Sequence, residues 1–139
     1  MPETIADVMT PDPHTLDARA TVEEAAQAMK QDDIGDVIVC EGDNVCGIVT
    51  DRDIAIRVVA EGRAAADVRL GDICSKELTT VSTQTSIEDA VGLMRQKALR
   101  RLPVCEDGRP VGVVTIGDLA QARDRDSALA SVSSAPPNN

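Results

Sequence analysis

The chain contains a long internal repeat, and this repeat limits its possible folds more than any other feature. At an offset of 65 residues, residues 5–55 align without a gap to residues 70–120, and 14 of the 51 aligned positions are identical. Most of the remaining pairs keep the same chemical character, as Val22 and Ile87 do. Two halves this similar must share one fold and be related by approximate two-fold symmetry.

Each half has the sequence pattern of a β-α-β-β-α unit. A short β-prone stretch precedes a helix with one apolar face, and two further β-prone runs joined by a turn predict a hairpin. A Thr-x-x-Asp sequence ends each hairpin and starts a second helix. The expected helix-starting residues are Thr21, Thr50, Ser86 and Thr115. The sequence therefore predicts a mixed α/β (α+β) fold with repeats over 1–65 and 66–126 and a disordered tail over 127–139.

Composition excludes several classes of function. Hydrophobic residues make up 42% of the chain, which is too many for a disordered protein, yet no apolar run approaches the roughly 20 residues that cross a bilayer. The formal charge of −10 and the absence of aromatic residues disfavour nucleic-acid binding. The acidic N-terminal sequence does not resemble a secretory signal. We expect a cytoplasmic protein that binds neither membranes nor nucleic-acid polymers.

The four cysteines and one histidine do not form a recognisable metal-binding set. No two cysteines have CxxC spacing, so no metal site is predicted. Cys40 and Cys105 end apolar runs, which favours packing roles. Cys40 and Cys46 flank a short turn, and a redox-sensitive disulfide across that hairpin is the alternative.

Several sequence motifs resemble those of the paired cystathionine β-synthase (CBS) domain, or Bateman module, of the stand-alone bacterial type. They are VMTPD near the start, GIVTDRDIA over 47–55, LRRLPV over 99–104 and GVVTIGDLA over 112–120. The resemblance covers residues 5 to about 122. It implies two repeats packed sheet to sheet, two clefts that bind adenosine-containing ligands (AMP, ADP, ATP or S-adenosylmethionine), and a homodimer of modules.

The resemblance also implies roles for individual residues. Asp53 and Asp118 would contact ribose hydroxyls, and Thr50 and Thr115 would contact ribose or phosphate. The residues expected in the preferred cleft are Thr50, Arg52, Asp53 and Arg101 for ribose and phosphate, with Thr80, Leu102 and Pro103 around the base. The residues expected in the second cleft are Thr15, Asp36, Val37, Thr115 and Asp118.

Charge makes the two expected clefts unequal. Arg52 lies beside Asp53, and Arg101 of the second repeat would face the same cleft. The repeat equivalent of Arg101 is Asp36, which would face the Asp118 cleft. Replacing a cation near the phosphate by an anion should weaken phosphate binding by roughly several kcal/mol, as Coulomb's law gives at an effective dielectric near 20. We therefore expect ligand in the Asp53 cleft.

The leading prediction is a non-catalytic regulatory module that requires no cofactor and senses an adenine nucleotide or S-adenosylmethionine. Two alternatives remain open: a ligandless module for dimerisation or protein interaction, with a partner the sequence does not identify, and a cysteine-based, redox-responsive stress protein. In the first alternative, the two Thr-x-x-Asp sequences serve only as helix caps. An enzyme is the weakest interpretation, because the sequence has no Ser/His or Cys/His arrangement and no glycine-rich phosphate loop.

Overall fold

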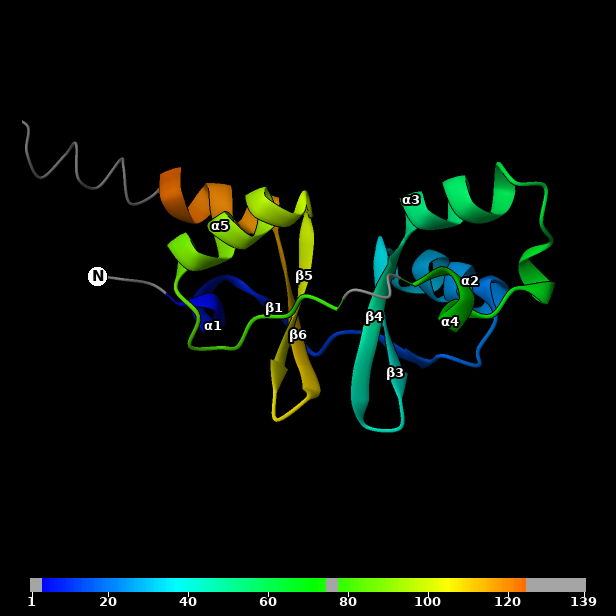
Figure 1. Ribbon diagram of the computed structural model, residues 1–139, viewed down its shortest axis with the longest axis horizontal. Coiled ribbons are helices and arrows are strands. Elements are labelled where there is room, and N and C mark those ends of the chain that lie inside the picture. The colour runs from blue at the N-terminus through cyan, green and yellow to red at the C-terminus, as the bar shows by residue number, and fades with distance from the viewer. Residues whose placement is uncertain (1–3, 75–77, 125–139) are drawn as a thin grey trace, which may run out of the picture.

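Both repeats form the expected β-α-β-β-α unit in the computed structural model, which describes residues 4–74 and 78–124 (Figure 1). The first repeat contains β2 (Thr15–Asp17), α2 (Val22–Asp32), β3 (Asp36–Glu41), β4 (Asn44–Thr50), α3 (Asp51–Ile54) and the π-helical turn η1 (Ala55–Val59). The second contains a single bridge at Val81, α5 (Ile87–Lys97), β5 (Arg101–Glu106), β6 (Arg109–Thr115) and a helix over 116–124. The predicted fold class is confirmed, and the tail expected over 127–139 lies outside the described residues.

The two hairpins repeat each other residue by residue. Asp36 pairs with Thr50 across β3 and β4, and Arg101 pairs with Thr115 across β5 and β6. Both hairpins shift register at the same place, between Val39 and Cys40 in the first and at the equivalent position in the second. The repeated sequence therefore fixes pairing as well as strand position.

The first long helix of each repeat starts and packs as its sequence predicts. Thr21 Oγ1 accepts from the backbone N–H of Glu24 at 3.2 Å, and Ser86 Oγ accepts from that of Asp89 at 3.1 Å. These bonds satisfy N–H groups that the first helical turn leaves free. The apolar face of each helix is buried against its own sheet, through Val22, Ala25 and Met29 in α2 and Ile87, Ala90 and Met94 in α5.

The short segments that precede the two repeats are exchanged between them. α1 (Ile5–Val8) and β1 (Thr10–Pro11) pack on the second repeat, where β1 adds to β6. Conversely, η2 (Ala65–Asp67) and α4 (Leu70–Ile73) pack on the first repeat. Figure 1 shows α1 beside α5 and α4 beside α2. Each structural half thus contains a segment that belongs by sequence to the other repeat.

The two sheets meet through a small apolar interface between β3–β4 and β5–β6. Its buried members and the residues packed against them are Ile38, Cys40, Val45, Ile48, Cys105 and Val113. Gly112 permits a further close approach, because a Cβ there would lie 2.7 Å from Met9 Sδ and 2.8 Å from the carbonyl oxygen of Thr10. Gly112 thus lets the exchanged β1 segment lie directly against β6.

Cys40 and Cys46 lie on opposite faces of the β3–β4 hairpin. Cys40 belongs to the interface between sheets, whereas Cys46 packs against the core of the first repeat. The alternation of side chains along a strand produces this separation. The alternative prediction of a disulfide between Cys40 and Cys46, which rests on their spacing, is therefore wrong. In the described part of the chain, no helix is long and apolar enough to cross a membrane.

Candidate ligand-binding clefts

The two Thr-x-x-Asp sequences form identical turns where β4 and β6 end. Thr50 N donates to Asp53 Oδ2 at 2.9 Å, and Asp53 N donates to Thr50 Oγ1 at 3.1 Å. Thr115 and Asp118 make the same two bonds at the same two distances. One carboxylate oxygen of each Asp is thus committed to the helix cap, and the other remains available to a ligand.

Arg57 distinguishes the first turn from the second. Its Nε lies 4.0 Å from Asp53 Oδ1, and its Nη1 donates to the carbonyl oxygen of Ile73 at 2.8 Å. The repeat equivalent of Arg57 is Ala122, which is fully buried in the core of the second half. Our sequence reasoning missed Arg57, although extending the repeat alignment by two positions reveals the Arg/Ala difference.

Arg101 reaches from the second repeat to the start of α3. Its Nη1 donates to the carbonyl oxygen of Gly35 at 2.7 Å, and the same oxygen accepts from Asp51 N at 3.0 Å. A Cβ at Gly35 would lie 3.3 Å from both Arg101 Nη2 and Asp51 Oδ2, so the absence of a side chain makes room for the guanidinium. The guanidinium of Arg101 therefore lies beside Asp51, the residue that directly follows Thr50 in the chain.

The expected separation of Arg101 and Asp36 into different clefts is not observed. Arg101 Nη1 lies 3.4 Å from Asp36 Oδ2, and both side chains are partly buried. Burial raises the pKa of Asp36, Arg101 opposes this rise, and the neighbouring Asp51 adds to it. Because the two charges partly cancel, the electrostatic difference between the clefts is smaller than the sequence argument assumed.

The residues expected around the base are placed on two faces of the sheets. Leu102 and Val37 are fully buried in the cores of their own repeats, so only their backbone groups can face a ligand. Pro103 follows Leu102 on the opposite face of β5, and its carbonyl oxygen accepts from Val81 N at 3.1 Å. Thr80 lines a pocket with residues of both hairpin turns.

The remaining residues of the prediction lie near the strand ends. Thr15 pairs with Ile38 in the parallel ladder of β2 and β3. Arg52 follows Asp51 in the exposed first turn of α3, and its backbone N–H donates to the Asp51 carboxylate at 2.8 Å. The structure thus gathers Thr50, Asp53 and Arg101, with Arg52 on the same turn. The side chains of Leu102, Pro103 and Val37 are buried and present no exposed surface to a ligand.

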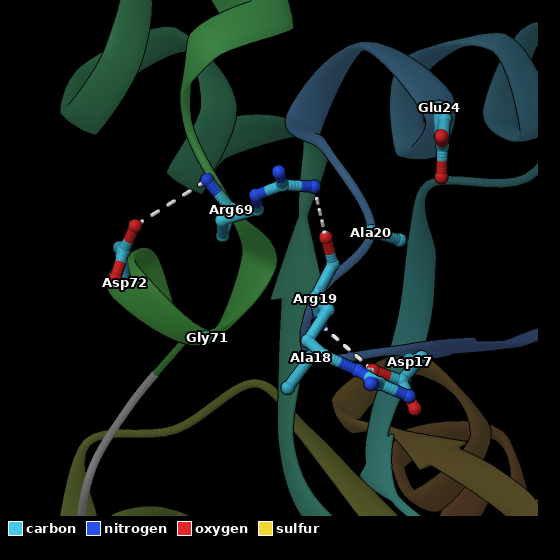
Figure 2. Close-up of a pocket in the computed structure, with 8 residues that line it drawn as sticks. All are labelled: Asp17, Ala18, Arg19, Ala20, Glu24, Arg69, Gly71 and Asp72. Carbon is cyan, nitrogen blue, oxygen red and sulfur yellow. Dashed lines mark hydrogen bonds and ion pairs between the residues drawn. The ribbon is translucent and has the colours of Figure 1, made fainter.

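A separate open pocket lies where α4 meets the loop between β2 and α2 (Figure 2). Arg19 and Arg69 line it, but each is engaged: Arg19 Nε bonds Asp17 at 3.0 Å, and Arg69 Nη1 donates to the carbonyl oxygen of Arg19 at 2.6 Å. Three acidic side chains also line the pocket, namely Asp17, Glu24 and Asp72. This charge balance does not favour an anionic ligand.

Metal binding has no support in the described residues, where no group of three or more His, Cys, Asp and Glu side chains is arranged to hold an ion. All four cysteines are free. His14 Nδ1 lies 3.0 Å from Asp32 Oδ2 in an isolated contact.

Comparison with known proteins agrees with this architecture. The CBS domain family model matches residues 5–60 and 70–125. The CBS domain-containing protein YhcV of Bacillus subtilis is 40% identical over 116 residues, which cover 84% of this chain and 82% of that protein.

Solved structures with similar folds include a hypoxic response protein I with two coordinated zinc ions, which is 32% identical and has a TM-score of 0.76 over 86% of this chain and 98% of that one. A putative signal-transduction protein with CBS domains from Burkholderia ambifaria is 31% identical, with a TM-score of 0.75 over 84% of this chain and 85% of that one. The repeat, the exchanged segments and these matches together show that the chain belongs to the CBS domain family, as a pair of CBS domains.

Proposed function

We propose that this CBS pair is a non-catalytic regulatory module that binds an adenosine-containing ligand (AMP, ADP, ATP or S-adenosylmethionine) in the cleft at Thr50 and Asp53. The observation that carries the proposal is the position of Arg101, whose guanidinium crosses from the second repeat to the start of α3. A ligand there would contact both repeats at once. Its occupancy would therefore alter how the repeats are held together.

The polar groups of this cleft match the parts of such a ligand. The free oxygen of Asp53 can accept from a ribose hydroxyl, and Arg101 can bind phosphate. Arg57, 4.0 Å from Asp53, adds a cation that the Asp118 turn does not have. With no aromatic residue in the chain, aliphatic side chains and backbone groups must hold the base.

Phosphate and Asp36 would compete for Arg101. The carboxylate of Asp36 lies 3.4 Å from the guanidinium, so an incoming phosphate must displace it or share the cation with it. Binding would then release an anion of the first repeat from a cation of the second. This exchange is a physical route from ligand occupancy to a change in the contact between repeats.

Calorimetry with AMP, ADP, ATP and S-adenosylmethionine tests the proposal. We expect at least one ligand to bind at sub-millimolar concentration and Asp53→Ala to reduce its affinity at least tenfold. Asp118→Ala is the matched control, because it removes the same carboxylate-accepted cap bond from the turn of the other repeat. Absence of binding, or equal affinity in wild type and Asp53→Ala, would contradict the proposal.

Asp36→Asn provides a sharper test, because it removes the competitor without touching the turn at Thr50 and Asp53. A phosphate-bearing ligand should bind the variant severalfold more tightly than it binds wild type. S-adenosylmethionine has no phosphate and should gain much less. Equal effects on both kinds of ligand would mean that Arg101 does not contact phosphate.

A ligandless dimerisation module is the second candidate function, favoured by exposed apolar side chains in the helical segments that follow the two hairpins. The exposed fractions are 47% for Ile56, 68% for Val59 and 52% for Ile116. A self-association surface would cover such groups. Sedimentation of wild type and of Val59→Asp tests this: a wild-type dimer that this substitution dissociates, with no ligand bound, supports the second candidate. A monomeric wild type would exclude it.

A further inference from the structure

We propose that Cys46 and Cys74 form an oxidisable dithiol that fastens the exchanged α4 segment to the first repeat. Cys46 lies on β4, and Cys74 is the C-cap residue of α4. Both pack against the same apolar core. Because α4 precedes the second repeat in sequence but packs on the first, a bond between these thiols would cross the exchange itself.

Both thiols lie on the side of β4 that faces α4. Cys46 and Cys74 pack against the same core, α4 contacts β4, and Cys74 Sγ lies 3.9 Å from the carbonyl oxygen of Gly71. Both residues are partly exposed, so a small oxidant can reach them. The other two cysteines differ, because Cys40 is only 8% exposed within the interface between the sheets and Cys105 packs there beside it.

The protonation of Cys46 indicates the order of the chemistry. Burial and the proximity of Cys74 raise the pKa of Cys46 to about 11, which makes its thiolate scarce at neutral pH. In the proposed reaction, Cys74 attacks a hydroperoxide. Its sulfur takes the distal oxygen, the O–O bond breaks, and with hydrogen peroxide the first water leaves as Cys74 becomes a sulfenic acid.

The second step closes the disulfide. Cys46 sulfur attacks Cys74 sulfur, the S–O bond breaks, and the second water leaves with the thiol proton. The balance is two thiols and one hydrogen peroxide giving one disulfide and two waters, so the peroxide is reduced by the two electrons that the thiols lose. The new bond would close a loop over residues 46–74, which contains Thr50, Asp53 and Arg57.

The full wild-type chain is treated with hydrogen peroxide, its remaining thiols are alkylated, and it is digested with trypsin and a Glu-specific protease. Cleavage after Glu41 separates Cys40 from Cys46, so no variant is needed to assign the bond. We expect the peptides containing Cys46 and Cys74 to be linked, with a mass loss of two hydrogens. The melting temperature should rise by about 5 °C or more, as for other disulfides closing loops of this length.

A variant pair provides the control. The double variant Cys40→Ala, Cys105→Ala keeps Cys46 and Cys74 as its only cysteines, so it should still form the disulfide. The single variant Cys46→Ala should not form it. Linkage of Cys40 to Cys105 in wild type, linkage only between separate chains, or full alkylation of Cys46 and Cys74 after peroxide would each overturn the proposal.

Discussion

Replacing Arg101 with methionine should weaken the contact between the two repeats. Methionine keeps much of the length and apolar stem of the side chain while removing its charge. The variant loses the 2.7 Å bond from Arg101 Nη1 to the carbonyl oxygen of Gly35 and the ion pair with Asp36. It also leaves Asp36 partly buried beside Asp51 without a cation.

The size of this loss follows from the two contacts. A hydrogen bond from a charged donor contributes about 1.5 kcal/mol or slightly more to the free energy of unfolding. The Coulomb attraction of unit charges 3.4 Å apart is about 5 kcal/mol at an effective dielectric near 20, and desolvation offsets more than half of it. We therefore expect Arg101→Met to lower the free energy of unfolding by about 3 kcal/mol at pH 7.

The ion-pair part of this effect should depend on pH. Burial already holds the pKa of Asp36 above its unfolded value of 3.8, and Arg101 opposes that rise. Without Arg101 the folded pKa rises further. An acid with a raised folded pKa contributes stability that is fully present below 3.8 and is lost as pH rises through the folded pKa. The difference between variant and wild type should therefore grow from pH 4 to pH 7.

Urea unfolding followed by circular dichroism measures these differences, since the chain has no aromatic residue for fluorescence. A double-mutant cycle with Asp36→Asn isolates the pair. Asp36→Asn alone should change stability by less than about 1 kcal/mol, because it also removes the repulsion from Asp51. The coupling energy should be about 2 kcal/mol. A coupling below about 0.5 kcal/mol would refute the argument that Arg101 and Asp36 stabilise the module as a pair.

Two further predictions concern the backbone. Ala98, the C-cap of α5, has a φ of 55°, a conformation that glycine adopts more easily than alanine. Ala98→Gly should therefore raise the free energy of unfolding by about 0.5–1 kcal/mol in urea titrations. The control Ala26→Gly, on the exposed face of α2, should lower it by a similar amount. Gly112→Ala should lower the melting temperature by several degrees, because its Cβ would meet the backbone of Thr10 at 2.8 Å and cost about 1–3 kcal/mol. The control Gly92→Ala should raise the melting temperature, because no atom lies within 4 Å of its Cβ. A stabilising Gly112→Ala would contradict the close packing of β1.

The features that the sequence predicted are those that depend on neighbours along the chain. The helix caps at Thr21 and Ser86, the hairpins and the two closed Thr-x-x-Asp turns all depend on residues only a few positions apart. A gapless repeat then extends each local prediction to its symmetry mate, which is why even the register shift recurs at the same place. Arg101 could be placed near Asp53 only through the family resemblance.

The features that the sequence did not predict depend on contacts between the repeats. The exchange of α1 and α4 leaves no local signal, because each segment is followed by a repeat on which it does not pack. The position equivalent to Cys46 in the second repeat is Val111, so the repeat gives no hint of a thiol pair. Cys74, which packs against the same core as Cys46, comes from the exchanged segment. Spacing along the chain instead suggested Cys40, which strand alternation places on the other face.

Two differences between the repeats lie beside the Asp53 turn. Arg57 replaces a buried alanine there, and the helix after the turn adopts a π-helical conformation, whereas the equivalent segment over 116–124 is α-helical. Arg57 also binds the carbonyl oxygen of Ile73, one residue before Cys74. The carboxylate that would meet a ribose is thus two contacts away from the segment that the disulfide would fasten. If both proposals hold, oxidation should change ligand affinity through Arg57, and Arg57→Met should uncouple the two while leaving the disulfide able to form.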